Sequence, residues 1–294
     1  MEEWNGTALQ PLLDAAQRQN RRVSALVLAQ QAAEQEQPPQ ALCRQMEQRY
    51  AVMCRSVADG CAPNLKSTSG LTGGEAARLQ AAVQAGRTLT GPVLSGALYR
   101  ALAASGANAA MGRIVAAPTA GSCGILPAAL LTMQAEHGCP GQACVEALFT
   151  AGAVGMVIAH RASLAGAQGG CQAECGSACA MAAAAIVELA GGTPRMIGDA
   201  VAIALKNMLG LVCDPVAGLV EIPCIKRNAA GVANAFVAAE LALAGVGSAI
   251  PPDEVIDAMK QVGDAMPQSL KETACGGLAA TPTGQALRRR VFGE

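Results

Sequence analysis

The chain has 294 residues, of which 52% are hydrophobic and only 2% aromatic, and its formal net charge is −1. This length is enough for a large buried core. The balanced charge, without a long basic run, argues against a nucleic-acid-binding surface. The mean hydropathy is high, at +0.31, but the apolar stretches are short or carry polar residues. We therefore expect no membrane-spanning helix.

Helical periodicity recurs along the chain, and no alternation of strands and helices interrupts it. Pro38 and Pro39 end the second helix, whereas Thr193 and Pro194 have the residue types that begin one. In chain order, we predict helices at 8–19, 23–36, 40–58, 75–86, 94–106, 125–137, 141–160, 171–190, 194–208, 225–244 and 253–265.

Long glycine-rich loops separate these helices at 59–74, 112–124 and 209–224. Short strands at 112–117 and 217–222 are the most β structure that the pattern allows. The tail from Lys271 is rich in glycine and threonine and is predicted as loop, with the run Arg288-Arg289-Arg290 in a solvated tail.

The predicted fold is mainly α, a compact helical domain with long glycine-rich loops and at most a few short strands. No linker or fixed-period repeat divides the chain. We expect residues 1–58 to form a helical lead-in packed on the core and residues 59–294 to form the main domain, the two together making one structural unit.

Two loops have the composition of anion-binding sites. The stretches 66–74 and 117–124 combine glycines with serine and threonine hydroxyls, and a predicted helix follows each of them. Free backbone N–H groups at a helix N-terminus favour a carboxylate or a phosphate. Neither loop has the spacing of a phosphate-binding P-loop or a dinucleotide fingerprint. The alternative is two ordinary capped loops.

Three cysteines stand beside glycine or proline, namely Cys171, Cys213 and Cys224. Thiolates delivered from turn-like backbone suit a metal site with one open position, because a closed cluster usually takes four cysteines. Cys175 and Cys179 follow Cys171 at helical spacing. These two either complete a local three-cysteine site or are small residues packed against a neighbouring helix.

The 12 cysteines, taken together, point to a reducing environment. Most of the cysteines lie in alanine-rich sequence, and the first ten residues lack the pattern of a secretion signal. We expect a cytoplasmic protein in which most thiols act as small hydrophobic groups. The non-enzyme alternative is a helical protein whose cysteines serve only packing or redox sensing. Cys275, in the tail, is interpreted as incidental.

Candidates for a catalytic base are few, since the chain has only two histidines. His160 ends an apolar helix eleven residues before Cys171, and Lys66 stands beside serines and glycines. His137 lies near a predicted helix C-terminus, where a cation is favoured. No Ser/His/Asp pattern suggests a hydrolase triad.

Four segments resemble the iron–sulfur-dependent L-serine dehydratases: 112–127, 169–174, 210–228 and 271–279. The resemblance runs from the first helices to residue 284 and is to the alpha, or catalytic, subunit of the two-subunit form. It implies a [4Fe-4S] cluster held by Cys171, Cys213 and Cys224, with the fourth iron open for substrate.

The same resemblance implies that L-serine becomes pyruvate and ammonia, a reaction of amino acid catabolism that feeds gluconeogenesis. It also implies a separate beta subunit and an oligomeric assembly, and it makes 59–294 the catalytic domain. The substrate would be held by the two Gly/Ser/Thr loops and by the asparagine after the third ligand. The residues are Ser67, Ser69, Gly70, Thr119, Gly121, Ser122 and Asn228.

Some details stay open within this resemblance. The base is His160, Lys66 or a group of the beta subunit. Some relatives carry a capping C-terminal cysteine or a histidine pair before the second ligand, whereas this chain ends in Glu294 and has 206–208 as Lys-Asn-Met. The same cluster chemistry on L-cysteine or L-threonine is an alternative, because one methyl group is worth only about 1–3 kcal/mol in a pocket.

Overall fold

A computed structural model describes residues 4–293. Over these residues the chain forms 13 α-helices and no strand, which confirms the predicted mainly-α fold. The stretches 112–117 and 217–222, which we allowed as strands, are loop and a 3-10 turn. The β pairing in the described chain is one parallel bridge between Cys213 and Lys271.

Each predicted helix is present, with ends that move by up to three residues. The one at 171–190 is split by a wider π-helical turn, η2 (Gln172–Gly176). The bounds are α1 Gln10–Arg18, α2 Val23–Glu34, α3 Pro39–Gly60, α4 Glu75–Gln84, α5 Gly91–Ala109, α6 Ile125–His137, α7 Gly141–Arg161, α8 Gly166–Gly169, α9 Ser177–Leu189, α10 Pro194–Lys206, α11 Cys224–Leu243, α12 Pro252–Ala265 and α13 Pro282–Phe292.

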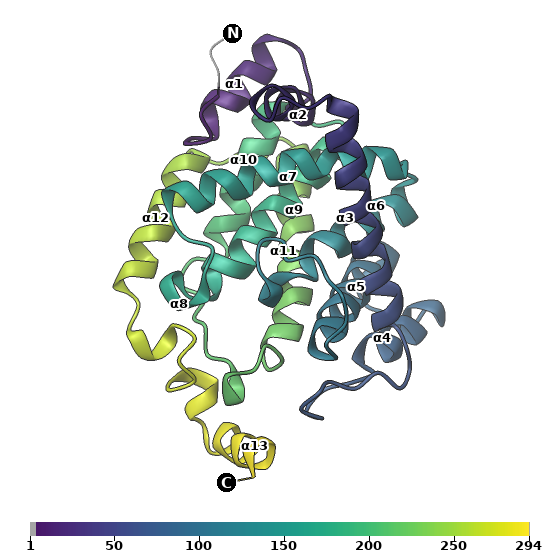
Figure 1. Cartoon of the computed structure of the whole chain (residues 1–294), viewed down its shortest axis with the longest axis vertical. Helices are drawn as coiled ribbons and strands as arrows, with labels where there is room; N and C mark the ends of the chain where they lie inside the picture. The colour runs from purple at the N-terminus through teal and green to yellow at the C-terminus, as the bar shows by residue number, and fades with distance from the viewer. Residues whose placement is uncertain (1–3, 294) are drawn as a thin grey trace.

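Helix α9 forms the centre of the molecule. It contacts α6, α7, α10 and α11, which surround it in Figure 1. Its side chains from Ser177 to Glu188 are all buried, and Ala178, Ala180 and 182–185 are fully so. Alanine is the best helix former and keeps helix axes close, so the alanine-rich composition produces a tightly packed helical core.

The N-terminal helices share this core. Leu12 and Leu13 of α1 and Val27 of α2 belong to the same buried apolar cluster as Leu130 of α6. The Asp253 carboxylate at the start of α12 accepts hydrogen bonds from the backbone N–H groups of Leu9 and Gln10, at 2.7 and 2.9 Å. Helix α1 is therefore capped by a residue 243 positions away in sequence.

Helix α7 is long and apolar, but most of it is buried inside the fold. By length and composition it is able to cross a membrane, with 21 residues and a mean hydropathy of 1.6 in its most apolar window. However, 67% of that window is buried inside the fold, which is the usual condition of a core helix. Arg161 at its end pairs with Asp257 of α12 at 2.5 Å.

The tail beyond Lys271 is more ordered than we predicted. It contains a 3-10 turn, η5 (Gly277–Ala280), and helix α13, which includes the run Arg288-Arg289-Arg290. The Thr281 hydroxyl caps α13 by accepting a hydrogen bond from Gly284 N at 3.1 Å. Helices α1 and α2 lie at one end of the long axis and α13 at the other (Figure 1).

Candidate active site

The three predicted ligand cysteines come from three separate segments. Cys171 lies between α8 and η2, Cys213 lies in the loop after α10, and Cys224 opens α11. All three are buried, with exposed fractions of 2%, 3% and 8%. Burial, and next the charge of Cys171, raise the pKa of Cys213 well above its usual range and that of Cys224 to about 12. Hydrogen bonds join the three segments: Gln172 N donates to Leu211 O, and Arg227 Nη1 donates to Val212 O, next to Cys213.

The π-helical turn η2 sets the position of Cys171. Gln172 N donates to Leu211 O and Gly210 N donates to Gln172 Oε1, both at 2.9 Å. Gln172 Nε2 also donates to Met259 O at 2.9 Å. Gln172 therefore fastens the Cys171 segment to the start of the Cys213 loop and to α12. Single π turns recur at functional sites.

The backbone of Cys213 is held by the C-terminal segment. Cys213 N donates to Leu270 O at 2.8 Å, and Glu272 N donates to Cys213 O at 2.7 Å. These two bonds make the parallel bridge with Lys271. The segment predicted as a loose tail is thus part of the framework of the site.

A buried ion pair continues this framework. Arg227 Nη2 lies 2.8 Å from Asp214 Oδ1, and Arg227 Nη1 donates to Val212 O at 2.8 Å. Asp214 Oδ2 accepts a hydrogen bond from Leu278 N at 2.8 Å. Arg227 also lies against Cys171: a hydrogen bond with Cys175 and then the Arg227 charge lower the pKa of the Cys171 thiol, although burial opposes them.

Glu174 faces the cysteines and was not predicted. Its Oε1 accepts a hydrogen bond from Thr119 Oγ1 at 2.7 Å, and its Oε2 lies 3.8 Å from Cys213 Sγ. Burial raises the pKa of Glu174, as does the nearby charge of Glu272, while the Thr119 hydroxyl acts in the opposite direction. Glu174 is the last residue of the segment 169–174, in which Cys171 alone was assigned a role from the sequence.

The second predicted loop, 117–124, reaches the site through Thr119. Thr119 and Ser122 form a reciprocal capping box around a 3-10 turn, with their hydroxyl oxygens 3.2 Å apart. At Gly121 an added Cβ would lie 3.0 Å from Glu174 Oε1. The loop therefore approaches the carboxylate with a hydroxyl and with bare backbone.

Asn228 ties this loop to the third cysteine. Its Nδ2 donates to Gly121 O at 2.7 Å and to Cys224 O at 2.9 Å, and its Oδ1 accepts from Gly124 N at 2.8 Å. Both amide hydrogens are thereby used on backbone groups. In this arrangement Asn228 positions the loop relative to Cys224.

The first predicted loop, 66–74, is a hydroxyl-bonded turn. Ser67 Oγ and Ser69 Oγ lie 3.3 Å apart, and they accept hydrogen bonds from Thr72 N at 3.3 Å and Leu71 N at 3.1 Å. Gly70 has a φ of +71°, which this tight turn requires.

Both loops meet at the C-terminal end of α5. Thr68 N donates to Ala109 O at 3.0 Å, and Asn108 Nδ2 donates to Ala120 O at 3.4 Å. Thr72 Oγ1 also donates to Glu221 Oε2 at 2.8 Å, just before Cys224. The fold thus brings the two hydroxyl-rich loops to one end of the molecule.

The two predicted bases are exposed. Lys66 lies at the start of the first loop, and His160 lies in the last turn of α7. Neither side chain forms a hydrogen bond or ion pair within residues 4–293. Their role as base stays a prediction.

Three further cysteines differ in their surroundings. Cys179 is fully buried and accepts a hydrogen bond from Asn234 Nδ2 at 3.0 Å, as the packing alternative requires. Cys175 instead lies with its sulfur 3.4 Å from that of Cys171. Cys275 is exposed and interacts with Thr273 O of its own turn.

The donor set fits an iron–sulfur cluster better than a lone ion. Across residues 4–293 no three His, Cys, Asp or Glu side chains are arranged to hold one metal ion. The cysteines of a cluster each bind a different iron, so their sulfurs need not converge on one point. Three buried thiolates would repel one another, and a cationic group bound between them would compensate that charge.

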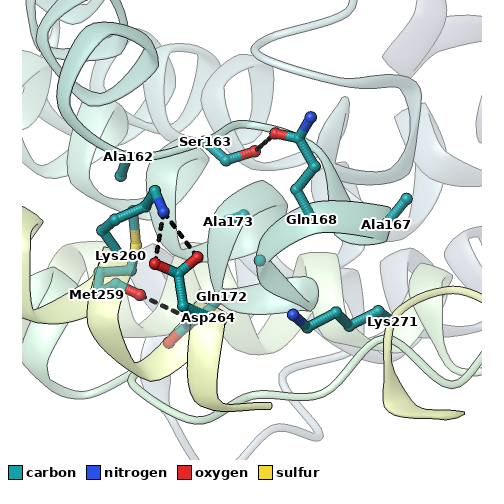
Figure 2. A pocket seen from close by; sticks show the side chains of 11 residues that line it. Ala162, Ser163, Ala167, Gln168, Gln172, Ala173, Met259, Lys260, Asp264 and Lys271 are labelled. Carbon is teal, nitrogen blue, oxygen red and sulfur yellow. Dashed lines mark hydrogen bonds and ion pairs between the residues drawn. The ribbon is translucent and has the colours of Figure 1, made fainter. Parts of the chain in front are cut away.

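A cavity of about 270 Å³ adjoins this site (Figure 2). It is lined by Ala167 and Gln168 of α8, whereas an added Cβ at Gly166 would lie 2.9 Å from Cys213 Sγ. Lys260 Nζ pairs with both Asp264 oxygens at 2.5 and 2.6 Å on its α12 side (Figure 2). One turn of α8 therefore separates the cavity from the cysteines.

Comparison with known proteins identifies a family whose model matches most of the chain. A family model described as "Serine dehydratase alpha chain" matches residues 18–279. A Bacillus subtilis protein named "Probable L-serine dehydratase, alpha chain" is 52% identical over 92% of this chain and 90% of its own length. The "L-serine dehydratase, alpha chain" of Peptoniphilus asaccharolyticus is 50% identical over 75% of this chain and 76% of its own length.

A longer relative matches in part. The Escherichia coli protein named "L-serine dehydratase TdcG" is 45% identical over 61% of this chain and 40% of its own length.

Proposed function

Because the chain belongs to the serine dehydratase alpha chain family, we propose that it is the alpha subunit of an L-serine dehydratase. It converts L-serine to pyruvate and ammonia, and it works with a separate beta subunit. The support is the function named for relatives that match 92% and 75% of this chain, together with the cysteine, hydroxyl and carboxylate groups gathered at one site. Cytoplasmic location and oligomeric assembly belong to the same proposal.

Cys171, Cys213 and Cys224 would hold a [4Fe-4S] cluster in this function. When bound, the cluster would supply a Lewis acid that assists the loss of the serine hydroxyl as hydroxide. The observation that carries this assignment is that three buried thiols come from three segments joined to one another by hydrogen bonds.

The residues around the cysteines would bind and orient the substrate. The hydroxyls of Ser122, Ser67 and Ser69 would be donors for the serine carboxylate. The Thr119 hydroxyl already donates to Glu174 and would act on the substrate through that carboxylate. The Glu174 carboxylate, fixed by Thr119, is the acceptor that the site offers to the substrate ammonium. Asn228 holds the second loop in place.

Proton removal from the substrate Cα needs a base. His160, Lys66 and a group of the beta subunit remain the proposed candidates. Both candidates of this chain are exposed, so closure by the beta subunit would be needed to exclude water from either one.

The test is Cys213→Ser in anaerobically purified protein with its beta subunit. We expect this variant to lose the near-ultraviolet and visible absorbance of the cluster and the release of pyruvate together. Cys275→Ser, which alters an exposed cysteine, is the matched control and should keep both. Retention of absorbance and activity in Cys213→Ser would refute the ligand assignment.

The substrate is tested separately. We expect pyruvate from L-serine to exceed 2-oxobutyrate from L-threonine and sulfide from L-cysteine under the same anaerobic conditions. Faster sulfide release would favour a desulfidase instead.

A further inference from the structure

Two cysteines of the site lie unusually close together. The sulfurs of Cys171 and Cys175 are 3.4 Å apart, and both side chains are buried, with exposed fractions of 2% and 1%. Cys175 is not one of the three proposed ligands. Its sulfur therefore lies next to a ligand sulfur without having a part in the proposed catalytic function.

The two cysteines are joined by a short irregular segment. Cys171 directly precedes the π-helical turn η2, and Cys175 lies within it. Gly170, with a φ of +74°, and Gly176 flank the pair. The sulfurs need to approach from 3.4 Å to about 2.05 Å to form a bond.

We propose that Cys171 and Cys175 form an oxidation site, closing into a disulfide when Cys171 is not bound to iron. With hydrogen peroxide as oxidant, the two thiols lose their hydrogens and the S–S bond forms. The peroxide O–O bond breaks, and two molecules of water leave. A small-molecule thiol reverses the step by exchange.

The consequence for the enzyme rests on the proposed cluster ligation. A disulfide at Cys171 removes one of three ligands, so a chain that lost its cluster to oxidation cannot be reloaded until it is reduced. The disulfide also keeps Cys171 from oxidation to sulfinic and sulfonic acids, which are not reversed by thiols.

The neighbouring cysteines are worse partners for Cys171. Cys213 is fixed through its backbone to Leu270 and Glu272, and its sulfur faces Glu174 Oε2 at 3.8 Å. Cys179 lies one turn beyond Cys175, and its sulfur is engaged by Asn234 at 3.0 Å. Cys175 is therefore the expected partner, and Cys179 provides a matched control.

The test uses the position of Glu174 between the two cysteines. The full chain is freed of iron anaerobically, treated with hydrogen peroxide, alkylated and cut after glutamate. Cleavage after Glu174 and Glu188 separates Cys171 from the peptide 175–188. We expect the two peptides to stay joined, with the mass of two hydrogens lost, and to separate after reduction.

Variants identify the partner. Cys179→Ala should give the same joined peptides as the wild type, whereas Cys175→Ala and Cys175→Ser should give none. Two alkylated, separate peptides in the wild type, or joined peptides in both Cys175 variants, would overturn the proposal.

Iron and sulfide analysis separates this proposal from the cluster assignment. Cys175→Ser should still take up iron and sulfide on anaerobic reconstitution, because it keeps all three proposed ligands. Failure of the wild type to take up iron would sink the cluster assignment and leave the disulfide result standing. Failure of Cys175→Ser alone would show that Cys175 is itself a ligand and would overturn the proposed role.

Discussion

At the scale of single residues, Asn228 connects the substrate loop to the cysteines. Its side chain makes three hydrogen bonds to backbone groups of Gly121, Gly124 and Cys224, and it is 1% exposed. Removing such an amide leaves the backbone partners buried without partners, which costs more than the net strength of the bonds themselves.

We therefore predict that Asn228→Ala lowers the free energy of unfolding by about 3 kcal/mol and reduces kcat/KM. Urea unfolding and pyruvate release measure the two effects. Asn234→Ala is the control, because Asn234 lies on the same helix but bonds Cys179 and Ala204. An equal loss of kcat/KM in both variants would contradict the positioning role of Asn228.

Residue by residue, the sequence predicted the parts of the site that carry local signals. Cys171, Cys213 and Cys224 stand beside glycine or proline, and they lie just before η2, in the loop after α10 and at the start of α11. Glu174 and Arg227 lie within the segments 169–174 and 210–228 that carry the resemblance, but no glycine or proline beside them indicates a role. Their roles depend on partners distant in sequence, such as the Thr119–Glu174 hydrogen bond across 55 positions, and only the fold creates those contacts.

At the scale of elements, the single turn of α8 lies between the cavity and Cys213. Gly166 faces Cys213 Sγ and Glu174 Oε2, from which an added Cβ would be 2.9 and 2.8 Å away. Contacts below about 3 Å force one of the groups to move. The glycine is therefore required by the close approach of backbone to a cysteine sulfur.

Gly166→Ala should displace Cys213 and Glu174, so we expect less iron bound per chain and a large loss of activity with the helical fold retained. Iron analysis and circular dichroism report the two. Gly152→Ala is the matched change, since an added Cβ in α7 meets nothing within 4 Å. Normal iron content in Gly166→Ala would show that α8 accommodates the added methyl group and would contradict this prediction.

The docking of α1 offers a second test at this scale. Asp253→Ala removes the acceptor of the Leu9 and Gln10 N–H groups and should cost about 1 kcal/mol of unfolding free energy. Glu254→Ala, in the same first turn of α12 but exposed, removes the helix-dipole interaction alone. Equal urea midpoints of unfolding for Asp253→Ala and Glu254→Ala would contradict the role of Asp253 as the cap of α1.

Helices were predictable where apolar residues repeat at helical spacing within one segment. Eleven helices follow from this spacing, whereas the short α8 and helix α13 were missed. Helix α13 was missed although Thr281 and Pro282 repeat the start signal of Thr193 and Pro194. Gly276 and Gly277, which follow Cys275, favoured the prediction of a loop for the segment that ends in α13. The π turn η2 is different in kind, because the bonds that fix it come from Leu211, Gly210 and Met259, which lie outside its own segment.

At the scale of the whole molecule, buried thiols set the response to alkaline pH. Burial raises the pKa of Cys123 and of Cys179 to about 12, from the usual 9.0. Between these values the unfolded chain releases thiol protons that the folded chain keeps. Stability from these groups is thus fully present below pH 9 and is lost as pH rises toward 12.

We predict a fall in unfolding free energy of about 1.4 kcal/mol per pH unit for each such thiol, measured by urea unfolding in reductant at successive pH values above 9. Cys179→Ala should flatten this slope. Cys275→Ala, which alters an exposed thiol, should leave the slope unchanged. An identical slope in the Cys179 variant would contradict the assignment.

The alanine-filled centre restricts how this protein is able to evolve. Ala180 and 182–185 of α9 are fully enclosed by neighbouring helices. Any larger residue costs about 1–3 kcal/mol through overpacking, and glycine costs about 0.5–1 kcal/mol in the middle of a helix. Neither growth nor loss of a methyl group is neutral there. Lineages that diverge from this sequence should accumulate their changes on the outward faces of α1, α3 and α13, while α9 changes slowly.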